Sequence, residues 1–173
     1  LGSVRLDASE GCGEIQPLAS KEGGRWIVAD GAFASAQEFR PESGDSPSSD
    51  AGPLATLLRL YEEQGRHCVD QLDGVYALAV LNERDLFLAR DPLGIKPLYF
   101  CRHEGWLYFA SEIKALTPIS ERVQEFPPGH WYHSRQGLHR FFELKDWAAS
   151  AETPADPLEE IRRVLGESVR RRV

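Results

Sequence analysis

The feature that most constrains the fold of this sequence is a continuous apolar run, GVYALAVLN, at residues 74–82. A run of this length bounded by a turn dipeptide, here Asp73-Gly74, is typical of a strand that is buried on both faces. Shorter runs of aromatic and branched residues follow at 85–90, 98–102 and 106–111, each separated by a short polar turn or connection. These runs predict antiparallel hairpins in sheets that are covered on both sides.

Helical patterns stand on either side of these strands. Residues 53–65 carry apolar side chains at helical spacing, begin with Pro53 and end with Gly65, which suits a C-terminal cap. Residues 157–173 form a second amphipathic pattern, with its apolar face made of Leu158, Ile161, Leu165 and Val169. Helices together with antiparallel hairpins predict the α+β class.

The other elements are shorter. Residues 25–29 predict a buried strand closed by Asp30-Gly31, a dipeptide that is typical of turns. Residues 112–118 predict a short helix, and residues 130–134 and 138–144 predict another hairpin. Residues 40–53 consist almost wholly of Pro, Gly, Ser and Asp, which indicates a surface loop.

Composition narrows the classes of partner and compartment. The chain has 173 residues, with 20 basic and 27 acidic side chains and a net charge of −7, which argues against nucleic-acid binding. No run approaches the about 18 apolar residues of a membrane span, so no membrane partner is expected. Three cysteines at unpatterned spacings, Cys12, Cys68 and Cys101, favour a reducing cytoplasm over a disulfide framework.

The residues alone form no recognisable catalytic or metal site. His130 and His133 lie three apart in a predicted strand, so they face opposite sides and cannot share a metal. The sequence has no glycine-rich phosphate loop, and Cys12 between two glycines has no basic neighbour to activate it. We therefore expect no metal and no cofactor in this chain.

The stretch from 72 to 116 is nevertheless highly specific. Residues 89–99 read ARDPLGIKPLY and residues 109–116 read FASEIKAL. This stretch resembles the N-terminal glutamine amidotransferase domain of asparagine synthetases, the class II type with an N-terminal nucleophile. The flanking segments 57–72, 125–132 and 167–173 agree with the resemblance, which covers nearly the whole chain and weakens before residue 54.

The resemblance implies a four-layer αββα sandwich of antiparallel sheets, whose first strands would either lie upstream of Leu1 or be missing. Residues 1–156 would form the amidotransferase-like domain, and residues 157–173 would begin the helix leading into an ATP-dependent synthetase domain. That domain would use ATP and Mg. In the family, an N-terminal cysteine attacks glutamine with its own α-amino group as base. An Asn-Gly pair stabilises the oxyanion, and an arginine and an acidic residue hold the substrate.

The chain departs from this pattern at the residues that carry the chemistry. Leu1 is not a cysteine, so no catalytic residue is identified. The expected Asn-Gly-Glu reads Asp30-Gly31-Ala32, which keeps one backbone N–H but puts a carboxylate beside the developing oxyanion. Loss of an oxyanion donor alone costs roughly 10²–10³ in rate. Asp30 and Gly31 are therefore interpreted as remnants of a substrate pocket.

Two further positions of the pocket have more than one alignment. The substrate arginine falls on Gly2 or, if Arg5-Leu6 is matched, on Arg5, which we retain as a candidate remnant. The acidic residue falls near Pro53, with Asp50 as a substitute only after a gap.

The charged residues of the specific stretch match the family but lie away from the expected nucleophile. We predict that they are structural or interdomain groups that bond the turns between strands; a site for ammonia passage or domain signalling is the alternative. These residues are Asp91, Gly94, Lys96, Ser111, Glu112 and Lys114.

Three functions remain open at this point. The first is the amidotransferase-like part of an ATP-dependent amide-forming enzyme, partnered by its own C-terminal synthetase domain, with a degenerate glutaminase pocket. The second is the glutaminase domain of a working glutamine-hydrolysing asparagine synthetase whose cysteine segment lies outside this chain; only then would it bind glutamine. The third is a stand-alone interaction domain, which the helix pattern at 157–173 disfavours. A homodimer is compatible with each.

Overall fold

The computed structural model describes residues 16–20, 23–33, 52–146 and 154–170. The chain divides into two compact units, Leu1–Phe142 and Glu143–Val173, and each is described by itself. The predicted domain boundary after residue 156 stays a prediction.

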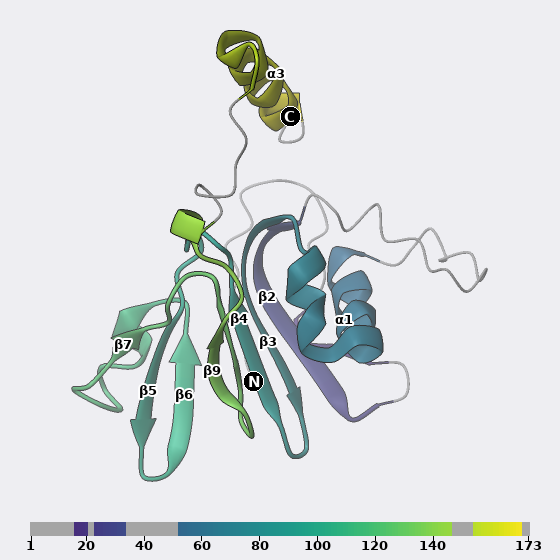
Figure 1. Cartoon of the computed structure of the whole chain (residues 1–173). Helices are drawn as coiled ribbons and strands as arrows, with labels where there is room; N and C mark the ends of the chain where they lie inside the picture. The colour runs from purple at the N-terminus through teal and green to yellow at the C-terminus, as the bar shows by residue number, and fades with distance from the viewer. Residues whose placement is uncertain (1–15, 21–22, 34–51, 147–153, 171–173) are drawn as a thin grey trace, which may run out of the picture. The chain divides into compact units, whose positions relative to one another are not determined.

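The first unit is built on a six-stranded sheet in the order β1-β2-β3-β4-β8-β9 (Figure 1). Each strand pairs with its neighbours in antiparallel orientation. Its strands are β1 (Leu18–Ala19), β2 (Arg25–Phe33), β3 (Gly74–Asn82), β4 (Leu86–Arg90), β8 (His130–His133) and β9 (Gly137–Arg140). The predicted apolar run therefore becomes a central strand, β3, as its composition requires.

A second sheet has three strands in the order β6-β5-β7, also antiparallel. Its strands are β5 (Tyr99–His103), β6 (Trp106–Ala110) and β7 (Gln124–Glu125). The helical elements of this unit are α1 (Pro53–Gln64) and the 3₁₀ helices η2 (Gly65–Gln71) and η3 (Ile113–Ala115). The strands predicted at 85–90, 98–102 and 106–111 are present as β4, β5 and β6, and the ends that differ from the prediction do so by one residue.

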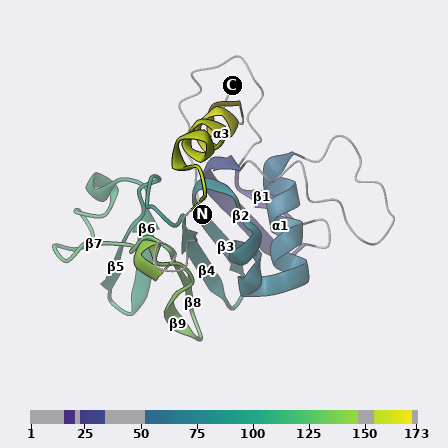
Figure 2. The ribbon, with the colours of Figure 1, turned by 45° about the horizontal axis from the view of Figure 1, so that its top comes forward.

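Alternate side chains of β3 enter two different cores. Tyr76, Leu78 and Val80 pack in one cluster with the apolar face of α1, which is formed by Leu54, Leu57, Leu58 and Leu60. Ala77 and Ala79 pack in the other cluster, against residues of the second sheet that include Phe100 and Phe109. The larger sheet thus lies between a helical layer and a second sheet, an order visible in two views (Figures 1 and 2).

The predicted α+β class and the antiparallel sheets are confirmed. One helical layer and two sheets of the predicted αββα sandwich lie within the described residues. Helix α1 starts at Pro53 and ends before Gly65, whose φ of 60° and N–H bond to the Tyr61 carbonyl oxygen form the expected cap.

The predicted turn at Asp30-Gly31 is wrong. Strand β2 continues through both residues to Phe33, because all nine of its residues pair with β3, with Asp30 opposite Ala77 and Gly31 opposite Tyr76. A full partner strand outweighs the local turn preference of the dipeptide. Gly31 also fits a close approach that no other residue allows, since a Cβ there would lie 2.1 Å from the Val75 carbonyl oxygen.

Two other predicted elements are shorter than the sequence suggested. The helix at 112–118 is only the single 3₁₀ turn η3, and the strand at 138–144 ends at Arg140. The predicted loop at 40–53 lies almost entirely outside the described residues.

The second unit contains α3 (Pro157–Arg170), as its amphipathic pattern predicted. The Asp156 carboxylate caps it by accepting the N–H groups of Leu158 and Glu159, each at 3.1 Å. Arg163 bonds Glu160 and Glu167 along its surface. Within the described residues, no helix is both long and apolar enough to cross a membrane.

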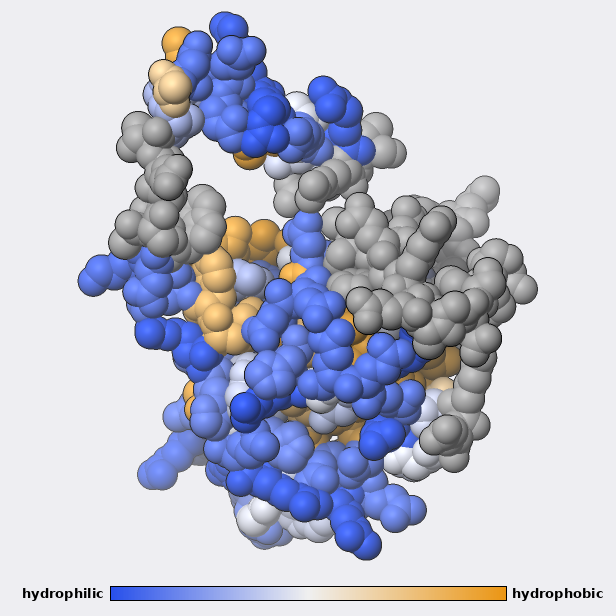
Figure 3. Space-filling model, turned by 45° about the vertical axis from the view of Figure 1, so that its right-hand side comes forward, coloured by the Kyte–Doolittle hydropathy of each residue, from blue (hydrophilic) through white to orange (hydrophobic). Residues whose placement is uncertain are grey.

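The face of the molecule drawn in Figure 3 is mostly hydrophilic, with smaller apolar areas between the charged side chains. Cys68 and Cys101 are both free and buried, whereas Cys12 lies outside the described residues.

Candidate functional site

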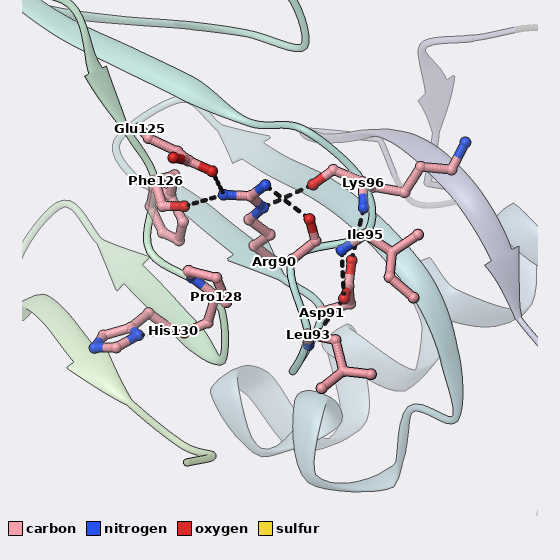
Figure 4. Close-up of polar contacts among 10 residues, drawn as sticks. Arg90, Asp91, Leu93, Ile95, Lys96, Glu125, Phe126, Pro128 and His130 are labelled. Carbon is pink, nitrogen blue, oxygen red and sulfur yellow. Dashed lines mark hydrogen bonds and ion pairs between the residues drawn. The ribbon is translucent and has the colours of Figure 1, made fainter. Parts of the chain in front are cut away.

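The carboxylate of Asp91 organises the connection between β4 and β5. Its side chain is 1% exposed and accepts four backbone N–H bonds. Oδ1 accepts from Leu93 at 3.1 Å and Ile95 at 3.0 Å, and Oδ2 accepts from Lys96 at 3.0 Å (Figure 4). Oδ2 also accepts from the N–H of Tyr76 at 3.3 Å. A buried carboxylate with several N–H donors fixes the backbone that supplies them. We call residues 91–96 the Asp91 turn.

Arg90, the last residue of β4, holds the same turn from the other side. Its side chain is 4% exposed, and its Nε donates to the Lys96 carbonyl oxygen at 2.7 Å. Nη2 donates to the Gly94 carbonyl oxygen at 2.9 Å, and Nη1 reaches both Phe126 O at 2.6 Å and Glu125 Oε1 at 2.7 Å (Figure 4). Because Glu125 belongs to β7, the guanidinium ties the turn to both sheets.

Gly94 is required by the space beside this guanidinium. Its φ is 66°, and a Cβ at this position would lie 2.7 Å from Pro128 Cγ and 3.2 Å from Arg90 Cζ. Any larger residue would push the Arg90 fork away from its acceptors.

The structure brings together two predicted site residues that are 66 positions apart. Lys96 Nζ donates to Asp30 Oδ1 at 2.9 Å, and the two side chains are 31% and 52% exposed. In Figure 4 the Lys96 side chain leaves the turn in the direction of β2, the strand that carries Asp30. The sequence alone suggested that Asp30 is an isolated charge. The structure shows that its carboxylate is paired with Lys96.

The other candidates lie in different places. Gly31 and Ala32 follow Asp30 along β2 and are exposed, and Pro53 is the first residue of α1. Arg5, like Gly2, Cys12 and Asp50, lies outside the described residues.

The charged residues after β6 are separate from the Asp91 turn. Ser111 and Glu112 are exposed, and Glu112 forms an ion pair with Lys114 at 2.5 Å on the surface. Their predicted structural or interdomain role stays a prediction.

Neither a nucleophile with its base nor a metal centre is assembled in the described part of the chain. Cys68 is buried, and burial, followed by the nearby charge of Asp70, raises the pKa of its thiol to about 12. A thiol that stays protonated is a poor nucleophile. No group of three His, Cys, Asp or Glu side chains that could hold a metal occurs among the described residues.

Sequence reasoning missed Arg90 and its partner Glu125. A signal was present, because an arginine follows the apolar run at 86–89 immediately before Asp91. A charged residue in such a place needs buried partners. The carbonyl oxygen of Phe126 could not be inferred, since it depends on the position of a segment 36 residues away.

A family model described as a glutamine amidotransferase domain matches residues 3–118. This chain belongs to that family. The amidotransferase domain is 36% identical to asparagine synthetase B [glutamine-hydrolyzing] of Escherichia coli (strain K12) over 177 residues, covering 98% of this chain and 32% of that protein. It is 34% identical to asparagine synthetase [glutamine-hydrolyzing] 2 of Oryza sativa subsp. japonica, covering 83% of this chain and 25% of that protein. The chain thus spans a third or less of these two relatives.

Solved structures agree on the fold of the amidotransferase domain. A glutamine phosphoribosylpyrophosphate amidotransferase from B. subtilis, complexed with ADP and GMP, superposes with a TM-score of 0.65 at 22% identity, covering 80% of this chain and 34% of that chain. A structure described as the allosteric regulatory enzyme of purine biosynthesis gives a TM-score of 0.60 at 24% identity, covering 74% of this chain and 31% of that one. The predicted class II, N-terminal-nucleophile type of fold is confirmed.

Proposed function

We propose that this chain is the amidotransferase-like domain of an asparagine-synthetase-type, ATP-dependent amide-forming enzyme, and that its glutaminase pocket is degenerate. The observation that carries the proposal is the Asp30 carboxylate, paired with Lys96 at 2.9 Å, where the family resemblance expects the amide of an asparagine. The remnants of this pocket would include Gly31 and Arg5.

The chemical reason is the difference between an amide and a carboxylate. An asparagine amide donates hydrogen bonds to a developing oxyanion, whereas an ionised aspartate only accepts them. Lys96 offsets much of the repulsion expected from Asp30 alone, so the principal loss is the donor itself. Loss of one such donor costs roughly 10²–10³ in rate. Ala32, at the position of the family glutamate, removes a second polar group.

The remainder of the enzyme would supply the synthetic chemistry. The relatives are named as asparagine synthetases, and the chain covers 32% and 25% of the first two of them. A synthetase domain that follows α3 would bind ATP and Mg and activate a carboxylate, and the whole protein would act in the cytoplasm. This partner domain would belong to the same polypeptide.

The test is glutamine hydrolysis by the full-length protein. We expect little release of ammonia or glutamate from glutamine, and an increase in the Asp30→Asn, Ala32→Glu double variant if an upstream cysteine is present. Glu83→Gln, a change at an exposed residue between β3 and β4 and outside the pocket, is the matched control and should leave the rate unchanged. Turnover by the unaltered protein at roughly 1–10³ s⁻¹ would show that the pocket is functional.

That outcome would favour the second candidate, a working glutamine-hydrolysing asparagine synthetase. The observation on its side is the 36% identity over 98% of this chain to a relative named as glutamine-hydrolyzing.

A further inference from the structure

The Asp91 turn is bonded to three strands, through different groups. Asp91 bonds the N–H of Tyr76 on β3, and Arg90 bonds the carboxylate of Glu125 on β7. The third link, to β2, is the ion pair between Lys96 and Asp30. The first link joins buried groups, and the second joins the buried Arg90 guanidinium to the exposed Glu125 carboxylate. The third depends on a carboxylate that replaces the expected asparagine.

We propose that Lys96 is a positioning residue for Asp30, and that their ion pair is a latch that fastens the Asp91 turn to β2. The interpretation of Asp30 as part of a former substrate pocket rests on the proposed function. The latch itself does not depend on that interpretation. The latch rebuilds the pocket wall with paired charges, so the position of the lost amide is occupied and not merely vacant.

Both ends of the latch are held by rigid backbone. The N–H of Lys96 donates to Asp91 at 3.0 Å, and its carbonyl oxygen accepts from Arg90 at 2.7 Å. The backbone of Asp30 pairs with Ala77 within the β2–β3 ladder. An exposed ion pair is ordinarily weakened by the entropy of two free side chains. Here the backbones on both sides are already bonded, so pairing orders only the two side chains.

The latch has a chemical consequence for ligands. One Asp30 oxygen is engaged by the ammonium, and both oxygens only accept hydrogen bonds. A carboxamide or carboxylate oxygen of glutamine would meet an acceptor at this position. Restoring asparagine alone would free the Lys96 ammonium, which adds one uncompensated positive charge to the same wall.

The experiment measures amide hydrogen exchange of Leu93 and Ile95 in the full-length protein. Lys96→Met and Asp30→Asn should each raise exchange at these amides by about 1.5- to 5-fold, the range for an exposed ion pair. The double variant should match either single variant, because both remove the same interaction. High salt should shrink these differences.

Two variants separate a charge interaction from a merely structural role. Lys96→Arg keeps the charge and should restore protection in part. The reversed pair, Asp30→Lys with Lys96→Asp, should restore more protection than either half alone. The control is Arg25→Met, at the other end of β2, which breaks the surface ion pair between Arg25 and Glu62 of α1. This variant should leave exchange at Leu93 and Ile95 unchanged.

Unchanged exchange in both single variants, or additive effects in the double variant, would overturn the latch. Its failure is distinguishable from failure of the proposed function, because glutamine turnover by the unaltered protein tests the pocket and exchange tests the ion pair.

Discussion

Asp91 and Tyr76 are hydrogen-bonded in both directions at the end of the ladder between β3 and β4. The N–H of Asp91 donates to the Tyr76 carbonyl oxygen at 2.9 Å, and the Asp91 carboxylate accepts the Tyr76 N–H at 3.3 Å. One residue thus extends the ladder of β3 and, through its other carboxylate contacts, folds the turn that leads to the second sheet. The passage of the chain from one sheet to the other is built on this residue.

Asp91→Ala should therefore lower stability. The change leaves backbone N–H groups of Tyr76, Leu93, Ile95 and Lys96 without their acceptor, and unpaired buried donors are costly. We expect a loss of about 2–4 kcal/mol in the free energy of unfolding, measured by urea denaturation. Asp91→Asn, which keeps an acceptor oxygen, should lose less.

An unaltered stability of Asp91→Ala, together with lost amide synthesis by the full-length protein, would contradict this expectation. It would favour the alternative role in ammonia passage or domain signalling.

Arg90→Lys should also destabilise the protein, although the charge is conserved. A lysine has one nitrogen and cannot reach the three carbonyl oxygens and the carboxylate that the guanidinium bonds together. The expected loss is about 2 kcal/mol or more, read from the thermal or urea midpoint. Arg59→Lys on the surface of α1 is the control and should change stability by less than about 0.5 kcal/mol. Equal losses of stability in Arg90→Lys and Arg59→Lys would be incompatible with a structural role for the Arg90 guanidinium.

Gly31→Ala should show how close β2 and β3 lie. A Cβ at this position would lie 2.1 Å from the Val75 carbonyl oxygen, so the ladder has to shift. We expect a loss of at least about 2 kcal/mol. Gly105→Ala is the matched control, because its φ is also positive at 80° but no atom lies within 4 Å. That variant should lose only about 1 kcal/mol, the cost of the backbone conformation.

Alkaline pH should destabilise the protein through Cys68. Burial, then the Asp70 charge, raises the pKa of the folded thiol from 9.0 to about 12. Between these values the unfolded chain ionises and the folded chain does not, so the free energy of unfolding falls as pH rises from 9 to 12. One such group contributes a slope of about 1.4 kcal/mol per pH unit.

Cys68→Ala should reduce that alkaline slope when urea midpoints are compared across the same pH range. Tyr61→Phe should remove a second contribution that begins near pH 10, because burial is the largest cause raising the Tyr61 pKa from 10.0 to about 12. Equal slopes in Cys68→Ala and the unaltered protein would show that the Cys68 thiol does not titrate in this way.

The sequence predicts the central strands well because their physics is local. The run at 74–82 contains almost no polar residue and can only be satisfied by burial on both faces, which is where β3 lies. Helix α1 is similarly marked at both ends by Pro53 and Gly65. These signals need no knowledge of distant partners.

The parts that the sequence did not predict depend on long-range pairing. Asp30-Gly31 reads as a turn in isolation, and only the length of β3 keeps it in a strand. The pairing of Asp30 with Lys96 joins positions 66 residues apart, so no local pattern reveals it. Arg90 was visible as an unusual residue, but its acceptors come from several segments.

The alternation of large and small side chains along β3 fixes the register of this strand. Its large side chains, Tyr76, Leu78 and Val80, face the helix, while Ala77 and Ala79 face the second sheet. A slip of one position would drive the bulky set into the narrow space between the sheets and leave voids under α1. A residue inserted within 74–82 should therefore prevent folding. A residue inserted in the turn at 103–105, between β5 and β6, should be tolerated, so this turn is the place where the domain can be lengthened.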